Sequence, residues 1–542
     1  MKHSIFNLVS FVLVSTVAFA ANPKLSPDLE NVDANSNAAV IVQYTSTPGP
    51  AHHEKVTSRG GTLKHDLSFI KSGAYSIPAS MLDDLASDPE VVHISLDRKI
   101  TGALDNTTVA VNAPTAWNAG LSGAGIGVAL IDSGITPDAD LDQSRVVYWH
   151  DWIANDWHDD YGHGTHVAGI IGGTGYRSHC SQCTRNLQGI APGVNFIDLR
   201  VLDQNGAGTD SYVIAAISEA ITLKSTYNIR VINLSLGRPV YESYKQDPLC
   251  QAVEAAWKAG IVVVVSAGND GRDNSQGTNG YGTITAPGND PYVISVGAMR
   301  TLGTPTRTDD LVASYSSKGP TVIDNIVKPD IVAPGNQVVS LYAQGATLYT
   351  DYPGNMMPMN FFIPPAGTAP SGLYFMLSGT SMAAPVVSGA AALLLQKSPS
   401  LTPDQIKAKL MLTAYKTFPT SSVATDPTTG QTFTSQYDIF TIGAGYLDIA
   451  AALADTTTFS GSALSATATF NSSNGTTTVV CGSASVCAKL PATGSKSIWG
   501  SKTLWGSKTL WGSQTLWGSK SIWGSTSTDA VESMAITING EN

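Results

Sequence analysis

The chain has 542 residues, of which 42% are hydrophobic and 13% charged, with a formal net charge of -11 at pH 7. This composition is typical of a globular protein with room for two or more domains, and the negative charge argues against a nucleic-acid partner. After the N-terminus no apolar run is long enough to span a bilayer.

The first 20 residues have the pattern of a secretory signal peptide. A short polar start with Lys2 precedes the apolar run from Ile5 to Phe19, and Ala18-Phe19-Ala20 gives a small-x-small cleavage site. We expect cleavage after Ala20 and a mature protein outside the cytoplasm, secreted or in the cell envelope. The alternative, a short anchor helix, is disfavoured because the run is too short.

Residues 21–105 contain a polar linker and then a small α+β unit. Strands are expected at 38–44, 74–77 and 91–95, with a helix at 79–88. The unit is followed by a polar segment, 97–108, that offers several points for cleavage.

Residues 106–455 alternate buried strands with helices. We expect strands at 127–131, 195–201, 230–233, 260–265 and 292–296, and helices at 163–172, 210–226 and 251–259. Apolar strands separated by helices predict an α/β fold, with a mostly parallel sheet and helices on both faces. Functional residues in such sheets gather at the C-terminal strand ends.

Residues 456–542 are rich in Ser, Thr and Gly and carry a Trp-Gly-Ser hexapeptide repeat. Trp recurs at every sixth position, at Trp499, Trp505, Trp511, Trp517 and Trp523. Because six is even, all of these side chains would share one face of an extended strand, whereas on a helix they would turn by roughly 240° per repeat. The pattern therefore favours a β-rich repeat tail over a helix.

Five cysteines in an exported chain suggest disulfides with one thiol left over. Cys481 and Cys487 flank a small loop that could close as a hairpin staple. Cys180 and Cys183 form a CxxC that could be a local disulfide, which we favour, or half of a metal site. Cys250 is expected to be a buried thiol.

A charge-free apolar run from Val386 to Leu395 predicts a helix buried on all sides. Ser381 lies at its start, where unpaired backbone N–H groups favour negative charge. Pro385 fits the first turn, where proline loses no hydrogen bond. By itself Ser381 would be interpreted as an ordinary N-cap.

Three more polar residues lie at strand ends or helix starts. Asp132 ends the strand at 127–131, His163 begins a small-residue helix, and Asn269 follows the strand at 260–265. Taken singly, each would be a turn or capping residue. Together with Ser381 they supply a nucleophile, a base, a carboxylate that orients the base, and an oxyanion donor, the groups needed for acyl transfer.

The blocks VALIDSGI, GHGTHVAGI and SGTSMAAP, in this order, closely resemble the subtilisin-like serine proteases. The resemblance implies a subtilisin-like fold, with Asp132 as orienting acid, His163 as base, Ser381 as nucleophile and Asn269 as oxyanion donor. His166 would be a neighbour of the base one turn along the helix.

The same resemblance implies where substrate binds. Ser235, Leu236 and Gly237 resemble the family's edge strand for extended substrate. Ala267 and Gly268, with Asn269, would form the other wall of the primary specificity pocket, and Thr285 would lie near its floor.

Residues 38–97, within 21–105, resemble the family's inhibitory propeptide. Acid-acting relatives carry Glu and Asp where this chain has His163 and Asn269, so that branch is excluded. The loop from Tyr176 to Arg185 carries the CxxC where many relatives bind calcium. We therefore predict no metal ligands and no required cofactor, and a structural calcium ion is unsupported; Asp140 is expected to be a solvated loop carboxylate.

The insert from Tyr342 to Tyr374 has no obvious counterpart in the family and could cover one end of the cleft or pack on the tail. The predicted function is a secreted serine endopeptidase, made as a self-processed zymogen, that cleaves polypeptides and is inhibited by its own propeptide. The alternative is a non-catalytic adhesion protein on a protease scaffold, with the Trp repeats binding an extracellular partner. The complete set of four site residues argues against this alternative.

Overall fold

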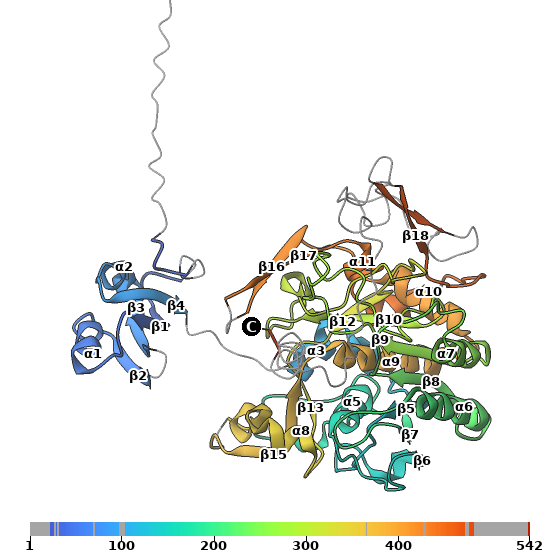
Figure 1. Cartoon of the computed structure of the whole chain (residues 1–542). Helices are drawn as coiled ribbons and strands as arrows, with labels where there is room; N and C mark the ends of the chain where they lie inside the picture. Colours follow the sequence, from blue (N-terminus) through green and yellow to red (C-terminus); the bar gives the residue numbers. More distant parts are fainter. Residues whose placement is uncertain are drawn as a thin grey trace, which may run out of the picture. The chain divides into compact units, whose positions relative to one another are not determined.

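The computed structural model describes residues 22–26, 29, 32–68, 71–96, 103–364, 366–426, 430–471, 476–481 and 540–541. Its contacts divide the chain into two compact units, Met1–Ile100 and Thr101–Asn542 (Figure 1). The predicted signal peptide, the Trp repeats and Cys487 lie outside the described residues, as does part of the predicted cleavable segment. Within the described ranges no helix combines the length and apolarity needed to cross a membrane.

The first unit is an antiparallel sheet with two helices. The strand order is β2-β3-β1-β4, with β1 at Asn37–Tyr44, β2 at Thr62–Leu67, β3 at Ser72–Pro78 and β4 at Val91–Leu96. Every second residue of β1 is buried, which gives the unit a core of its own.

Three predicted strands of this unit are confirmed. Helix α1 (Pro50–Thr57) and strand β2 were not predicted, and the predicted helix at 79–88 is a 3-10 turn at Ala79–Met81 followed by the short α2 (Leu82–Ala86).

The second unit is built on an eight-stranded sheet in the order β11-β10-β9-β8-β5-β7-β6, with β12 paired to β10. All neighbours are parallel except β10 and β11, so the predicted mostly parallel sheet is confirmed. The strands are β5 (Gly127–Asp132), β6 (Val146–Asp151), β7 (Asn195–Arg200), β8 (Ile229–Leu234), β9 (Val262–Ser266), β10 (Ile294–Arg300), β11 (Leu311–Val312) and β12 (Ile331–Pro334).

Two pairs of helices pack on this sheet. Helix α5 (His163–Gly172) packs with α9 (Thr380–Lys397), and α6 (Asp210–Tyr227) packs with α7 (Pro248–Lys258). The remaining helices are α3 (Ala103–Ala110), α4 (Ala113–Asn118), α10 (Pro403–Thr413), α11 (Ile439–Ile442) and α12 (Ile449–Ala454). Helix α9 contacts β8, β9, β10 and β12, and it is buried without a break from Met382 to Leu395, as predicted.

The predicted place of Pro385 in the first turn is wrong. Helix α9 begins at Thr380, so Pro385 lies inside the helix as its sixth residue. A proline at this depth removes the N–H that would otherwise bond the carbonyl of Ser381, four residues back. That carbonyl takes a different donor, the hydroxyl of Ser235 at 2.8 Å.

The insert at 342–374 contributes to a small sheet beside α5 (Figure 1). Its strand order is β13-β15-β14, with β13 at Val338–Leu341, β14 at Met356–Pro358 and β15 at Pro370–Leu377, and helix α8 lies at Thr347–Asp351. The backbone N–H of Leu348 donates to the carbonyl of Tyr161, so the insert contacts the residues just before α5.

Two hairpins complete the unit. The first pairs β16 (Ser421–Thr425) with β17 (Thr432–Gln436), and the second pairs β18 (Thr467–Asn471) with β19 (Thr476–Val480). The second hairpin is tied to the segment that precedes β12, because Val327 donates to the carbonyl of Ala466 and Ala468 donates to that of Asn325.

Candidate active site

The strand order brings three predicted groups to one edge of the sheet. Strands β5, β8 and β9 are adjacent and parallel, so their C-terminal ends lie side by side. Asp132 ends β5, residues 235–237 follow β8, and residues 267–269 follow β9. The sequence order of these groups says nothing about this adjacency, which follows from the pairing of the strands.

Asp132 and His163 form a buried hydrogen-bonded ion pair. The Oδ1 atom of Asp132 lies 2.7 Å from Nδ1 of His163 and also accepts the N–H of Ser133 at 2.8 Å. The Asp132 side chain is 0% exposed and that of His163 is 15% exposed. Burial lowers the pKa of His163, but the charge of Asp132 and its hydrogen bond outweigh this and raise that pKa above its ordinary value.

Two residues that the sequence analysis did not assign hold the start of helix α5. The Asp159 carboxylate accepts the N–H groups of Gly162 at 2.7 Å and Thr165 at 2.8 Å, and the Ser133 hydroxyl accepts the N–H of Gly164 at 2.9 Å. The Ser133 hydroxyl in turn donates to Asp159 at 2.8 Å. The sequence did contain a signal for Asp159, because an acidic residue just before a helix is attracted by the unpaired N–H groups of its first turn.

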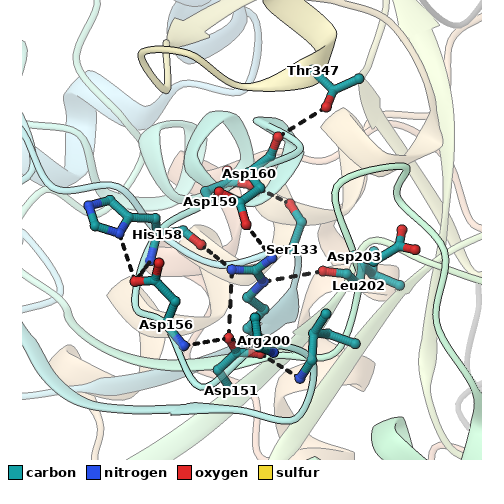
Figure 2. A network of polar contacts seen from close by, with 12 residues as sticks. Ser133, Asp151, Asp156, His158, Asp159, Asp160, Arg200, Leu202, Asp203 and Thr347 are labelled. Carbon is teal, nitrogen blue, oxygen red and sulfur yellow. Dashed lines mark hydrogen bonds and ion pairs between the residues drawn. The ribbon is translucent and has the colours of Figure 1, made fainter.

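A second network holds the loop that precedes α5 (Figure 2). Arg200, at the end of β7 and 2% exposed, donates to the carbonyl of His158 at 2.7 Å and to the carboxylate of Asp160 at 2.7 Å. The carbonyl of Asp160 accepts the N–H of Thr347 at 2.9 Å. The loop before α5 is therefore hydrogen-bonded both to the end of β7 and to the insert.

Ser381 is the second residue of α9, and its hydroxyl and carbonyl both bond Ser235. The Ser381 hydroxyl donates to the carbonyl of Ser235 at 3.1 Å, and the Ser235 hydroxyl donates to the carbonyl of Ser381 at 2.8 Å. No hydrogen bond joins Ser381 to His163, both of which are described residues. The predicted base and nucleophile thus lie at the starts of two helices, α5 and α9, that pack together.

The sequence did not predict a buried chain of hydrogen bonds that connects Ser235 to helix α9. The amide of Asn233 donates to the Ser235 hydroxyl at 3.0 Å, and its carbonyl oxygen accepts the hydroxyl of Ser388 at 2.8 Å. Asn233 and Ser388 are both 0% exposed. Their bonds lock helix α9 onto β8 two turns after Ser381, and a buried Asn inside an apolar strand was the only sequence signal.

The orientation of the Asn269 amide is determined by its neighbours. Its Oδ1 atom accepts the backbone N–H of Thr380 at 2.9 Å and the Thr380 hydroxyl at 3.1 Å. A backbone N–H can only donate, so the atom that faces it is the oxygen, and Nδ2 points elsewhere. Gly379 has φ +144°, and a Cβ there would lie 3.4 Å from Nδ2, which places the amide nitrogen beside the turn that leads to Ser381.

The predicted walls of the specificity pocket meet at Thr285. A Cβ on Gly237 would lie 2.6 Å from Oγ1 of Thr285, and one on Gly268 would lie 2.9 Å from its Cγ2. The carbonyl of Ala267 accepts the N–H of Thr285 at 3.1 Å. The segments at 235–237 and 267–268 therefore approach each other across this threonine.

His166, one turn after His163, is fully buried and has different partners. Its Nε2 atom lies 3.1 Å from the carbonyl of Val338 and 3.0 Å from that of Phe375. Because both partners only accept, Nε2 carries a proton, and burial lowers the pKa of His166 to about 3. His166 is therefore neutral at pH 7 and ties α5 to strands β13 and β15.

The prediction that Asp140 is a solvated carboxylate is wrong. Asp140 is 0% exposed; its Oδ1 accepts the N–H of Arg177 at 2.8 Å, and its Oδ2 accepts the hydroxyl of Tyr374. Tyr374 comes from the insert, which explains why the surrounding sequence did not reveal this burial. Each oxygen already accepts a hydrogen bond from the protein, which does not favour a calcium ligand at this position.

The cysteines partly follow the predictions. Cys180 and Cys183 form a disulfide, Cys481 is disulfide-bonded, and Cys250 is a buried free thiol. Across the part of the chain that the structure describes, His, Cys, Asp and Glu side chains do not gather in threes that could hold a metal ion.

Comparisons with known proteins show which proteins this chain resembles. A family model described as "Subtilase family" matches residues 123–445. The chain is 36% identical over 362 residues to the serine protease AprX of Bacillus subtilis (strain 168), covering 64% of this chain and 75% of that protein. It is 30% identical over 411 residues to subtilisin E of the same strain, covering 75% and 92%. The crystal structure of a cold adapted subtilisin-like serine proteinase aligns with 30% identity and a TM-score of 0.39, over 55% of this chain and 84% of that one.

Proposed function

The chain belongs to the subtilase family and is a serine endopeptidase, and from that premise we propose that Ser381 attacks the peptide bond, with His163 as base and Asp132 as its orienting acid. The observation that carries the proposal is the 2.7 Å bond between Nδ1 of His163 and Asp132. It engages Nδ1, so Nε2 is the nitrogen left to accept a proton from the nucleophile.

The proton transfer requires the Ser381 hydroxyl to leave its present hydrogen-bond acceptor. The Ser381 hydroxyl donates to the carbonyl of Ser235 at 3.1 Å, a weak bond at the long end of the O–H···O range. Rotation of the hydroxyl towards Nε2 gives His163 the proton as Ser381 attacks the substrate carbonyl. The cation that forms on His163 is stabilised by Asp132, and the same proton then goes to the leaving amine.

We assign the oxyanion that develops on the substrate carbonyl to two donors. One is Nδ2 of Asn269, whose Oδ1 is held by Thr380. The other is the backbone N–H of Ser381, which is among the first residues of α9 and points out of the helix start. Both donors are fixed before the reaction, which is the condition for strong transition-state stabilisation.

Ser381→Ala tests the nucleophile. Loss of the nucleophile of such a triad costs about 10⁶ in turnover, so we expect no measurable cleavage of a casein-type substrate and an unchanged fold by circular dichroism. A serine-directed covalent inhibitor should label the wild type and leave the variant unlabelled. Activity within tenfold of wild type, or labelling of the variant, would refute Ser381 as the nucleophile. A wild type that neither cleaves nor is labelled would favour the alternative of a non-catalytic adhesion protein.

The backbone of Ser235, Leu236 and Gly237 is proposed to pair with extended substrate, with Ala267 and Gly268 as the facing wall. The approach of both segments to Thr285 supports this proposal. Gly237→Val should raise KM for a peptide substrate because the new side chain enters that space. An unchanged KM would place the substrate elsewhere.

The protease is further proposed to be a secreted, self-processed zymogen. The support is a separate compact unit at Met1–Ile100 with its own core, ahead of the catalytic unit. Ser381→Ala protein should keep residues 38–97 covalently attached, whereas wild type should lose them. If the variant is trimmed to the same N-terminus, another protease does the processing.

No cofactor is proposed for the reaction, because side chains supply the nucleophile, base and oxyanion donors. Activity should survive a chelator such as EDTA with less than about twofold loss. The Trp repeats are proposed to bind outside the cell, to a polysaccharide, a partner or the protease itself, and deletion of 491–525 should leave cleavage of a small peptide nearly unchanged.

A further inference from the structure

The polar side chain of Glu541 is buried in the catalytic unit, although the residue lies far along the chain from every strand of the sheet. Glu541 is 5% exposed. Its Oε1 atom lies 3.1 Å from a guanidinium nitrogen of Arg272 and its Oε2 lies 3.0 Å from one of Arg300. The hydroxyl of Ser314 and the backbone N–H of Tyr315, at 3.2 Å, also donate to Oε1.

The backbone of the same segment is held as closely as the carboxylate. The Asn336 amide donates to the carbonyl of Glu541 at 2.8 Å, and its oxygen accepts the N–H of Glu541 at 2.8 Å. Gly540 has φ +73°, and a Cβ there would lie 2.5 Å from the hydroxyl oxygen of Ser378. The site therefore fits a glycine followed by a glutamate and excludes a side chain at the first position.

The walls of this site also carry the proposed catalytic groups. Arg272 lies three residues after Asn269, and the next residue back, Gly271, donates its N–H to the carbonyl of Tyr315 at 2.8 Å. The carbonyl of Gly335 accepts both the Tyr315 hydroxyl at 3.0 Å and the N–H of Gly379 at 2.8 Å. Ser378 and Gly379 form the turn that leads into α9 and Ser381.

We propose that Arg272, Arg300, Ser314, Tyr315 and Asn336 form a binding site for a Gly-Glu peptide segment, which Gly540 and Glu541 fill in the intact chain. The filled site holds the Asn269 loop and the turn before Ser381 in the geometry that the transition state needs. Glu541 is thus a positioning residue. This second part rests on the proposed role of Asn269, whereas the binding site itself does not.

The charges explain why occupancy should matter. The Arg272 and Arg300 side chains are only 11% and 7% exposed, so both cations are largely removed from water. Arg272 also has Asp426 within 3.3 Å, and Arg300 pairs with Glu541 at 3.0 Å. Removing one partner of a buried pair leaves an uncompensated charge, which is far more costly than losing a surface pair.

The first test is Glu541→Gln in the full-length chain, with Glu254→Gln as control. Glu254 pairs with Lys258 on the surface of α7, four residues apart. We expect Glu541→Gln to lower Tm by about 4 °C or more and the control to lower it by less than about 1 °C. Equal Tm values for the two variants would refute the binding site. To prevent self-digestion, both are measured in the Ser381→Ala background.

The second test supplies the segment in trans. A labelled peptide of residues 533–542 is added to Ser381→Ala protein that ends at residue 539, and binding is followed by fluorescence anisotropy. Saturable binding is expected, at least about tenfold weaker for the same peptide with Gln at position 541. Absence of binding, or equal binding of both peptides, would refute the site, and neither result depends on catalysis.

The positioning role is tested in the active enzyme. Glu541→Gln should lower kcat about tenfold with little change in KM, because the oxyanion donors meet charge only in the transition state. Adding the Glu peptide to active protein that ends at residue 539 should restore kcat, and the Gln peptide should not. A kcat equal to that of Glu254→Gln would refute the positioning role while the binding site stands on its own measurements.

Discussion

Ser235 and Ser381 exchange hydrogen bonds, each hydroxyl donating to the carbonyl of the other residue. The exchange is possible because Pro385, inside α9, has no N–H for the carbonyl of Ser381. The hydroxyl of Ser235 replaces that missing donor. Ser235, the residue just after β8, therefore completes the hydrogen bonding of the helix that carries the proposed nucleophile.

Ser235→Ala should destabilise the protein through this carbonyl. A buried acceptor left without a donor costs about 1–3 kcal/mol, so the unfolding free energy measured in urea should fall by that amount. In a Pro385→Ala background the helix regains its own N–H donor, so the cost of the same substitution should fall by about 1 kcal/mol. The remaining cost comes from the buried Asn233 amide, which loses its acceptor in both backgrounds. An equal cost in both backgrounds would mean that the carbonyl of Ser381 is not the group that matters.

Asn269→Leu should lower kcat by roughly 10²–10³ with little change in KM, because the amide nitrogen meets charge only in the transition state. The structure adds a control, since Oδ1 of Asn269 also accepts the N–H of Thr380. Asn269→Asp keeps that acceptor and replaces the Nδ2 donor with a carboxylate oxygen, which would repel the oxyanion. Its Tm should stay closer to wild type than that of Asn269→Leu, while its kcat falls at least as far. A loss confined to KM would mean that Asn269 contacts the ground state.

The pH profile of kcat/KM should show one rise, governed by His163. The base acts only when neutral, so activity is lost as the pH falls through its folded pKa, which is raised above 6.5 by Asp132. The contribution of His163 to the free energy of unfolding depends on pH in the opposite direction. Because the folded pKa exceeds the unfolded one, this group's contribution is complete below about pH 6.5 and is lost as the pH rises through the folded pKa. A midpoint below pH 5 would contradict the assignment.

Asp198 provides a matched control for Asp132. It lies beside Leu130 of β5, accepts the N–H of Ile135 at 3.0 Å, and burial raises its pKa well above the ordinary value. A raised carboxyl pKa costs stability as the pH rises above about 4, because the folded state favours the neutral form. Asp198→Asn should therefore keep kcat within about threefold of wild type and should not lower Tm at pH 7, whereas Asp132→Asn should lose about 10⁴ in kcat. A large loss of kcat in Asp198→Asn would mean that Asp198 carries charge.

Local patterns were sufficient to predict the elements that hold the proposed catalytic residues. The blocks around Asp132, His163 and Ser381 identify strand ends and helix starts, and helix α5 has the predicted bounds. What the patterns could not provide was pairing across long sequence separations. Glu541 and Arg300, which form an ion pair, are 241 residues apart in the sequence. Tyr374 and Asp140, which form a hydrogen bond, are 234 residues apart.

The two corrections share this cause. Asp140 was expected in water because its own loop is polar, and its partner Tyr374 comes from a distant insert. Pro385 was expected in the first turn because proline is tolerated there, and the donor that replaces its N–H is Ser235, which follows β8. In both cases the hydrogen-bond donor comes from a residue far away in the sequence, so the neighbouring residues did not reveal it.

Gly540 and Glu541 are bound to the catalytic unit, and this affects what happens when the backbone is cleaved within residues 482–539. Before the stretch 482–539, the hairpin of β18 and β19 is bonded to the segment that precedes β12. After it, Glu541 is bonded to Arg272 and Arg300. A single backbone break between these anchors would therefore produce two fragments that remain associated without a covalent link. Such a nicked protease would run as two bands under denaturing conditions and as one species in native gel filtration.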